Sequence, residues 1–131
     1  MTEDNHQTQP NPDLPTIDFV CGLIACHGSF GWTKIGSASL PVFQLKMRGE
    51  EIDLLQNAAK VVGLTESIHN YQKGNRHFVL LIVRKAASLD KLIHTIDHRL
   101  WGIKKTTFET WRDAYYRHRL NKQYNVSQGT T

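Results

Sequence analysis

The residues with the clearest capacity for chemistry are His27 and Asp18, which share one predicted helix. His27 closes the stretch CGLIACH, and Asp18 lies about two and a half helical turns before it. If the His27 imidazole acted as a general base, catalysis would need a partner histidine, and none stands at a useful spacing. Asp18 is expected to favour the N-terminus of the helix electrostatically. The spacing by itself therefore assigns no catalytic residue.

The two cysteines, Cys21 and Cys26, lie on the same predicted helix. Their separation along the helix places them on different faces, so an intramolecular disulfide is not expected. Neither CxxC nor a paired His–Cys spacing occurs, which argues against a zinc site. We expect buried free thiols in a reducing compartment, and we expect neither a metal nor another cofactor.

Basic residues dominate the chain outside its acidic N-terminus. The formal net charge is +4, although residues 1–15 contain no Lys or Arg, and the segment 99–122 is the most basic. A basic surface can bind nucleic-acid phosphates or an anionic membrane surface. The alternative is that these charges only keep the protein soluble. No apolar stretch reaches the ~18 residues of a membrane span, and the N-terminus resembles neither a signal nor a transit peptide.

The elements that must position these residues follow from changes in hydrophobic periodicity. The length of 131 residues fits one domain over 16–122, with a polar N-terminal tail at 1–15 and a C-terminal tail at 123–131. The predicted elements are a helix at 17–27, strands at 29–36 and 40–47, a helix at 50–63, strands at 66–72 and 76–84, and helices at 88–100 and 107–120. This order indicates an α+β fold in which helices cover one face of a four-stranded antiparallel sheet.

The first helix has two distinct faces. Its bulky residues are expected in the core of the domain, and they are Phe19, Val20, Leu23 and Ile24. The small residues Gly22, Ala25 and Cys26 form a stripe that permits close contact with another helix, either of a second copy or of a different partner. Packing of this stripe against the domain's own sheet is the alternative.

The stretch FVCGLIACHGSF resembles the LAGLIDADG motif of homing endonucleases. The segments PVFQLKM, LLQNAAKVVGL and LWGIKKTTFETWRDAY follow in the family's order and spacing, so the resemblance covers roughly residues 16–120. It implies an αββαββα saddle whose sheet lies on duplex DNA. It also implies that a chain with one motif pairs through this helix, so that cleavage of the family's kind would require a homodimer.

The same resemblance implies that parts of the active site are missing. In the family an acidic residue before the final glycine of the motif holds divalent cations, and His27 occupies that position here. Ala25 replaces an earlier acid, and Met47 stands where a polar residue is expected, whereas Lys104 or Lys105 corresponds to a basic residue. We therefore expect a degenerate endonuclease that is not an enzyme.

The uncovered face of the sheet is the predicted binding surface. Polar residues that alternate with apolar ones along the strands should point away from the helices, and a solvated face with no ligand is the alternative. The predicted nucleic-acid-binding residues are Lys34, Gln44, Lys46, Arg48, His69, Tyr71, Lys73, Arg76, His77, Lys104 and Lys105.

Three functions are weighed for this surface. The first is binding of structured RNA as a component of an organellar ribonucleoprotein, either a ribosome or an intron complex, which favours a mitochondrial location. The alternative is an active, homodimeric, site-specific DNA homing endonuclease, with DNA as the partner. A protein interaction module leaves the basic surface unexplained.

Overall fold

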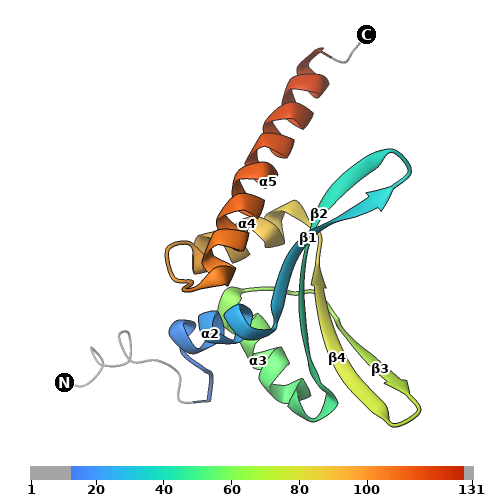
Figure 1. The fold of residues 1–131 in the computed structure, drawn as a ribbon, viewed down its shortest axis with the longest axis vertical. Helices are drawn as coiled ribbons and strands as arrows, with labels where there is room; N and C mark the ends of the chain where they lie inside the picture. Colours follow the sequence, from blue (N-terminus) through green and yellow to red (C-terminus); the bar gives the residue numbers. More distant parts are fainter. Residues whose placement is uncertain (1–12, 129–131) are drawn as a thin grey trace, which may run out of the picture.

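The computed structural model describes residues 13–128 and their side chains as far as Lys122. The chain runs through α2 (Ile17–His27), β1 (Gly28–Ile35), β2 (Ala38–Arg48), the short 3₁₀ helix η1 (Gly49–Glu51), α3 (Ile52–Val62), β3 (Ile68–Lys73), β4 (Arg76–Val83), α4 (Ala86–Ile96) and α5 (Ile103–Gln128). Figure 1 shows this order, which confirms the predicted α+β arrangement.

The four strands form one antiparallel sheet in the order β1-β2-β4-β3. Both hairpins turn at a glycine with positive φ, Gly36 at 63° and Gly74 at 61°, a conformation that glycine adopts without steric cost. The second turn was predicted correctly. The expectation that Ser37, Ala38 and Ser39 separate the first two strands is wrong, because β2 already begins at Ala38.

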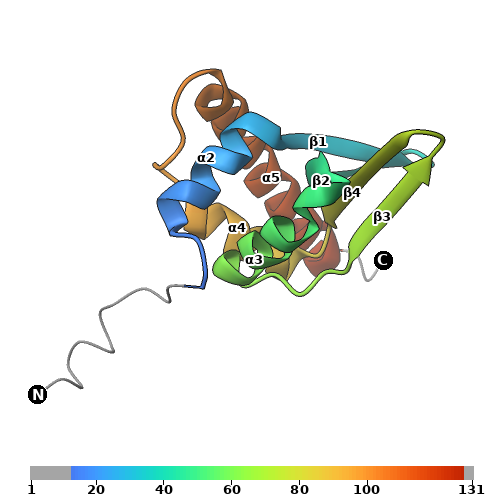
Figure 2. The same ribbon diagram turned by 90° about the horizontal axis from the view of Figure 1, so that it is seen from below.

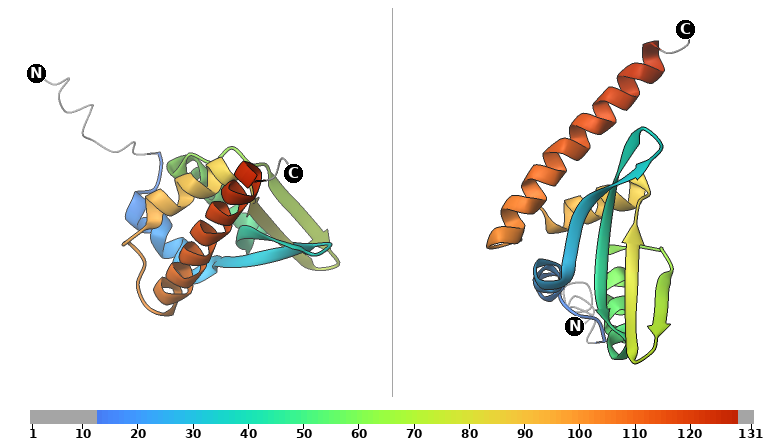
Figure 3. Two further views of the ribbon diagram at one scale, coloured as in Figure 1. Left: turned by 90° about the horizontal axis from the view of Figure 1, so that it is seen from above. Right: turned by 45° about the vertical axis from the view of Figure 1, so that its right-hand side comes forward.

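Within residues 13–128, the helices gather on one side of the sheet and leave its other side uncovered (Figures 2 and 3). Every second residue along the inner strands points into the core, including Phe43 and Leu45 of β2 and Leu81 of β4. They meet apolar residues of the helices, such as Ile24 of α2 and Leu55 of α3. This layer fixes which strand residues face outward.

Helix α2 begins as the sequence predicts. The Thr16 side chain accepts a hydrogen bond from the Phe19 backbone N–H at 3.1 Å, which satisfies a free donor at the helix start. Val20 and Ile24 are buried, but Phe19 is 48% exposed, so its predicted place in the core is wrong. Cys21 is a buried thiol whose pKa is raised by burial.

The exposure of Cys26 corrects the expectation that both thiols are buried. An α-helix turns by about 100° per residue, so five residues carry the chain to a different face. Cys21 therefore faces the core, and Cys26 faces outward near the end of α2.

Helix α5 is longer than predicted, since it begins at Ile103 and continues to Gln128. It therefore includes part of the segment assigned to a C-terminal tail. The division into one domain and two tails stays a prediction, since residues 1–12 and 129–131 lie outside the described part of the chain. Among the described residues, no helix is long and apolar enough to cross a membrane.

Polar contacts hold α5 to the rest of the domain. The Arg112 guanidinium donates to Asp97 at 2.7 Å, and that of Arg119 donates to Asp90 at 2.6 Å. The Trp111 indole N–H donates to the Gly31 carbonyl of β1 at 2.9 Å. These bonds tie one helix to both α4 and the sheet edge.

Candidate nucleic-acid interface

The uncovered side of the sheet, here called the open face, is defined by strand alternation. Because Phe43, Leu45 and Met47 of β2 enter the core, the intervening Gln44, Lys46 and Arg48 point to the other side. The paired residues of β3 and β4 share that side. They are Tyr71 and Phe78, His69 and Leu80, and Lys73 and Arg76. The structure thus brings together, from three adjacent strands, seven of the eleven predicted binding residues: Gln44, Lys46, Arg48, His69, Tyr71, Lys73 and Arg76.

Cations on the open face come from both strands that flank β4. Lys46 and Arg48 come from β2 on one side, and Lys73 comes from β3 on the other. Arg76 lies beside Lys73 at the turn that joins β3 to β4. Arg48 donates to Glu50 at 3.0 Å in an exposed ion pair, and backbone hydrogen bonding and Arg48 together lower the pKa of that carboxyl. Lys46, Lys73 and Arg76 remain exposed at the surface.

The centre of the open face is apolar, and this feature was not predicted from the sequence. Phe78, Leu80 and Ile82 alternate with the core residues of β4 and are half-buried, and none of the described helices lies above them. We call these three residues the β4 spine. The signal for it was present in the sequence, because the run FVLLIV is apolar at every position instead of alternating.

The aromatic ring of Phe78 is held between neighbours from both adjacent strands. The Tyr71 ring stacks on it with centroids 5.0 Å apart and an interplanar angle of 22°. The Lys46 ammonium lies 4.2 Å from the centroid of the same ring, in a cation–π contact. His69 follows Tyr71 with ring centroids 6.2 Å apart. A continuous row of side chains therefore crosses the open face.

Two predicted binding residues lie elsewhere. Lys34 lies an even number of residues from Phe30 and Trp32, whose side chains contact α5. It therefore points to the helix side of the sheet. The neighbouring Thr33 points to the open face. His77 lies two residues before the core residue Val79, so its side chain points to the helix side of the sheet. Its Nε2 lies 2.7 Å from Asn70 Oδ1. The register and the turn position, which the sequence left open, decide both placements.

A hollow opens where α2 ends beside the sheet. Its volume is about 1190 Å³, and α2, β2, η1 and the β3–β4 hairpin all contribute to it. The residues that line it are Cys26, His27, Lys46, Met47, Arg48, Glu50, Glu51, Asn75, Arg76, His77 and Phe78. His27 therefore shares this hollow with the basic residues Lys46, Arg48 and Arg76.

Lys104 is the member of the predicted basic pair that reaches the end of α2. Its ammonium donates a hydrogen bond to the carbonyl of Gly28, the residue that follows His27. Lys105 points elsewhere and pairs with Glu109 at 3.8 Å, one turn further along α5. The sequence did not decide which of the two lysines lies near the end of α2, and in the structure it is Lys104.

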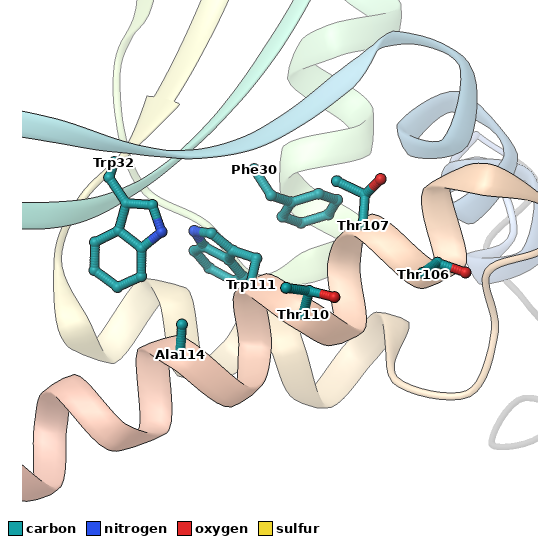
Figure 4. A pocket seen from close by; sticks show the side chains of 7 residues that line it. All are labelled: Phe30, Trp32, Thr106, Thr107, Thr110, Trp111 and Ala114. Atoms are coloured by element: carbon teal, nitrogen blue, oxygen red, sulfur yellow. The ribbon is translucent and has the colours of Figure 1, made fainter.

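A second hollow, of about 430 Å³, lies between β1 and α5 (Figure 4). Phe30 and Trp32 point into it from the strand, and Thr107, Thr110 and Trp111 border it from the helix. This groove lies on the helix side of the sheet and shares no lining residue with the hollow at His27.

No protein-family model and no curated protein matches this chain. Among solved structures, the chain is similar to the homing endonuclease I-TnaI, with a TM-score of 0.72 and 19% identity over 82% of this chain and 76% of that one. It is also similar to the LAGLIDADG homing endonuclease I-GzeII in complex with its DNA target, with a TM-score of 0.68 and 25% identity over 85% of this chain and 38% of that one. This chain has the LAGLIDADG homing-endonuclease fold.

A third LAGLIDADG structure gives the same result. The chain matches the meganuclease I-AabMI bound to uncleaved DNA with a TM-score of 0.70 and 19% identity, over 85% of this chain and 40% of that one. The chain therefore spans about two fifths of the length of I-GzeII and I-AabMI. The predicted αββαββα topology is confirmed.

The expectation that this LAGLIDADG-fold chain is not an enzyme is wrong. It rested on the residues His27, Ala25 and Met47, but the solved structures that share the fold are those of endonucleases, which are enzymes. Nothing in the described residues shows inactivity. Binding of DNA is what the names of the I-GzeII and I-AabMI structures state for those proteins.

The end of α2 does not fit a magnesium site of the kind that the resemblance implies. Mg²⁺ prefers carboxylate and water oxygens, whereas Cys26 and His27 offer sulfur and nitrogen. Met47 is only 7% exposed and belongs to the hydrophobic core, so it is not a polar residue of the site. Within residues 13–122, no three His, Cys, Asp or Glu side chains are grouped to hold a metal.

The predicted helix interface is partly exposed. Gly22 and Cys26 face outward, and a Cβ built on Gly22 would meet nothing within 4 Å. Ala25 instead packs against the core as a half-buried residue. The outward stripe therefore consists of Phe19, Gly22 and Cys26, with half-buried Leu23 at its side.

Proposed function

We propose that this chain binds duplex DNA across the open face of its sheet, as one half of a LAGLIDADG-type endonuclease. The observation that carries the proposal is the gathering of cations on a sheet face that none of the described helices covers. Lys46 and Arg48 come from β2, Arg76 from the start of β4, and Lys73 from the edge strand β3. Cations at these positions can neutralise backbone phosphates and fix the register of a duplex.

Side chains of the open face also have groups that read base edges. The Gln44 amide can pair with N6 and N7 of adenine, and an arginine such as Arg76 can pair with O6 and N7 of guanine. An antiparallel strand pair is narrow enough to approach the major groove. The DNA-bound structures of I-GzeII and I-AabMI support duplex DNA as the ligand.

Two copies of the chain are expected to act together. The chain spans about two fifths of I-GzeII and I-AabMI, which leaves room there for a second unit of similar size. The outward stripe of α2 supplies a close-packing surface, because Gly22 has free space at its Cβ position and Phe19 offers apolar area. A pair related by a twofold axis would recognise a target with two related half-sites.

Selection from a library of random duplexes tests this function. We expect the purified full-length chain to enrich one sequence with pseudo-twofold symmetry, and to retain it in competition with bulk duplex DNA. The enriched target, incubated with Mg²⁺ or Mn²⁺, then tests for cleavage at one position. Failure of every duplex to be enriched would refute the proposed function.

Structured RNA is the second candidate ligand. The Tyr71 ring is 41% exposed on the open face, and an exposed ring can stack on an unpaired base. In that case the RNA would belong to an organellar ribonucleoprotein, a ribosome or an intron complex. Competition between the selected duplex and folded RNA of equal length distinguishes the two ligands, and preferential binding of RNA at matched salt would favour this candidate.

A further inference from the structure

We propose that the β4 spine reads thymine through contact with its 5-methyl group in the major groove of the target. This inference rests on the proposed function, because it assigns a base preference to the same open face. Phe78, Leu80 and Ile82 are the residues that make the contact.

The spine breaks the pattern of a sheet that faces water on one side. Such a sheet alternates apolar and polar residues, whereas β4 is apolar on both sides from Phe78 to Val83. Val79, Leu81 and Val83 account for one side, since they are buried against the helices. The apolar residues on the other side have no covering element among the described residues, which indicates that a ligand covers them.

The flanking charges restrict the class of ligand. On β2, Lys46 lies opposite Leu80 and Arg48 lies opposite Phe78. On the other flank, Lys73 lies two residues beyond Tyr71 along β3 and points to the same side. A complementary ligand must be anionic at its edges and apolar at its centre. Duplex DNA meets this demand, because phosphates line the groove and the thymine methyl is the one apolar group that base edges present there.

The packing of Phe78 favours contact at the ring edge over stacking of a base. Tyr71 approaches the ring from β3 and Lys46 approaches it from β2, the strands on either side of β4. Both faces of the ring are thus occupied, and its edge is left for the ligand. A methyl group can meet this edge and the neighbouring Leu80, whereas an unstacked base has no free face on Phe78.

Replacement of thymine by deoxyuridine in the selected duplex tests the proposal directly. This change removes the methyl group and keeps every hydrogen-bonding group of the base. We expect thymines to recur in each half-site, and the unaltered protein to lose about three- to fivefold in affinity for each contacted methyl that is removed. The measurement does not depend on the folding of any variant.

A variant then assigns the effect to the spine. Leu80→Ala should bind the thymine and deoxyuridine duplexes nearly equally, because it lacks the surface that the methyl group covers. Leu120→Ala, which removes an exposed leucine from α5, is the matched control and should keep the preference for thymine. Retention of the full preference by Leu80→Ala would overturn the assignment to the spine.

The possible failures are distinguishable. Equal affinity of the unaltered protein for thymine and deoxyuridine duplexes would overturn this inference and leave DNA binding intact. Absence of binding to any duplex would overturn the proposed function and this inference together.

Discussion

Lys104 and Lys105 are neighbours in the sequence, yet only Lys104 is tied to the end of α2. Its ammonium satisfies the Gly28 carbonyl, at the point where the helix passes into β1. The sequence could name the pair but could not choose between its members, because the choice depends on how the start of α5 sits against α2. A contact between residues so distant in sequence follows from tertiary packing.

Replacement of each lysine by methionine tests this difference at the residue scale. Lys104→Met keeps an unbranched stem but leaves the Gly28 carbonyl without its donor, so we expect a loss of about 1 kcal/mol in the free energy of unfolding. Lys105→Met removes only an exposed pair with Glu109 and should cost less than about 0.5 kcal/mol. Urea titration measures both values, and equal losses would contradict the assignment.

Single residues of the open face were predictable where strand alternation was clear. Gln44, Lys46 and Arg48 alternate with the apolar residues of β2 and lie on the face that the sequence indicated. Lys34 and His77 were misplaced because a shift of one residue moves a side chain to the opposite face of a sheet. For Lys34, the first hairpin turn is shorter than predicted. For His77, the run FVLLIV that follows is apolar at every position, so alternation indicated no face.

At the scale of elements, α5 is held to α4 by a cluster of Asp90, Tyr115 and Arg119. The Tyr115 hydroxyl donates to Asp90 Oδ1 at 2.8 Å, and Arg119 donates to the other oxygen of the same carboxylate. Burial, followed by the contacts with Asp90, raises the pKa of Tyr115 to about 12. The sequence predicted a helix over 107–120, but not the polar partners of Tyr115.

This cluster makes the stability depend on alkaline pH. Tyr115 ionises near pH 10 in the unfolded chain and at about 12 in the folded one, so the unfolded state loses the proton first. Its contribution is present below about pH 10 and is lost as the pH rises toward 12, by about 2–3 kcal/mol in total. The stability of Tyr115→Phe should lack this part of the decline. Parallel stability curves for the two proteins in urea would contradict the prediction.

The close contact between η1 and β4 predicts that position 49 requires glycine, which can be tested by mutation. A Cβ built on Gly49 would lie 2.1 Å from Nδ1 of His77, too near for the ring to stay in place. Gly49→Ala should therefore cost about 1–3 kcal/mol in the free energy of unfolding. Adding His77→Ala removes the obstacle and should recover most of the loss. If the double variant showed the sum of the two single losses, His77 would not be the group that requires glycine here.

At the scale of the whole molecule, the order of elements and the layer arrangement followed from the sequence. Periodicity changed at each boundary, and glycines marked the second hairpin and the end of α3. The β4 spine was missed because the predicted binding residues were chosen among polar and aromatic side chains outside the apolar run FVLLIV. The prediction that the chain is not an enzyme was wrong because it judged activity from three positions instead of from the fold.

The salt dependence of binding tests most directly whether duplex DNA binds to the open face of the sheet. Lys46→Ala/Arg76→Ala removes one lysine and one arginine from that face. Lys60→Ala/Arg117→Ala removes the same charges from exposed positions on α3 and α5. Each phosphate contact contributes about 0.9 to the slope of log affinity against log salt.

Titration of the selected duplex over a range of salt concentrations compares the two variants with the unaltered protein. We predict that the slope becomes shallower by about 1.8 for Lys46→Ala/Arg76→Ala and stays unchanged for Lys60→Ala/Arg117→Ala. An equal change in both variants, or a change only in the second, would show that DNA binds elsewhere and would contradict the account.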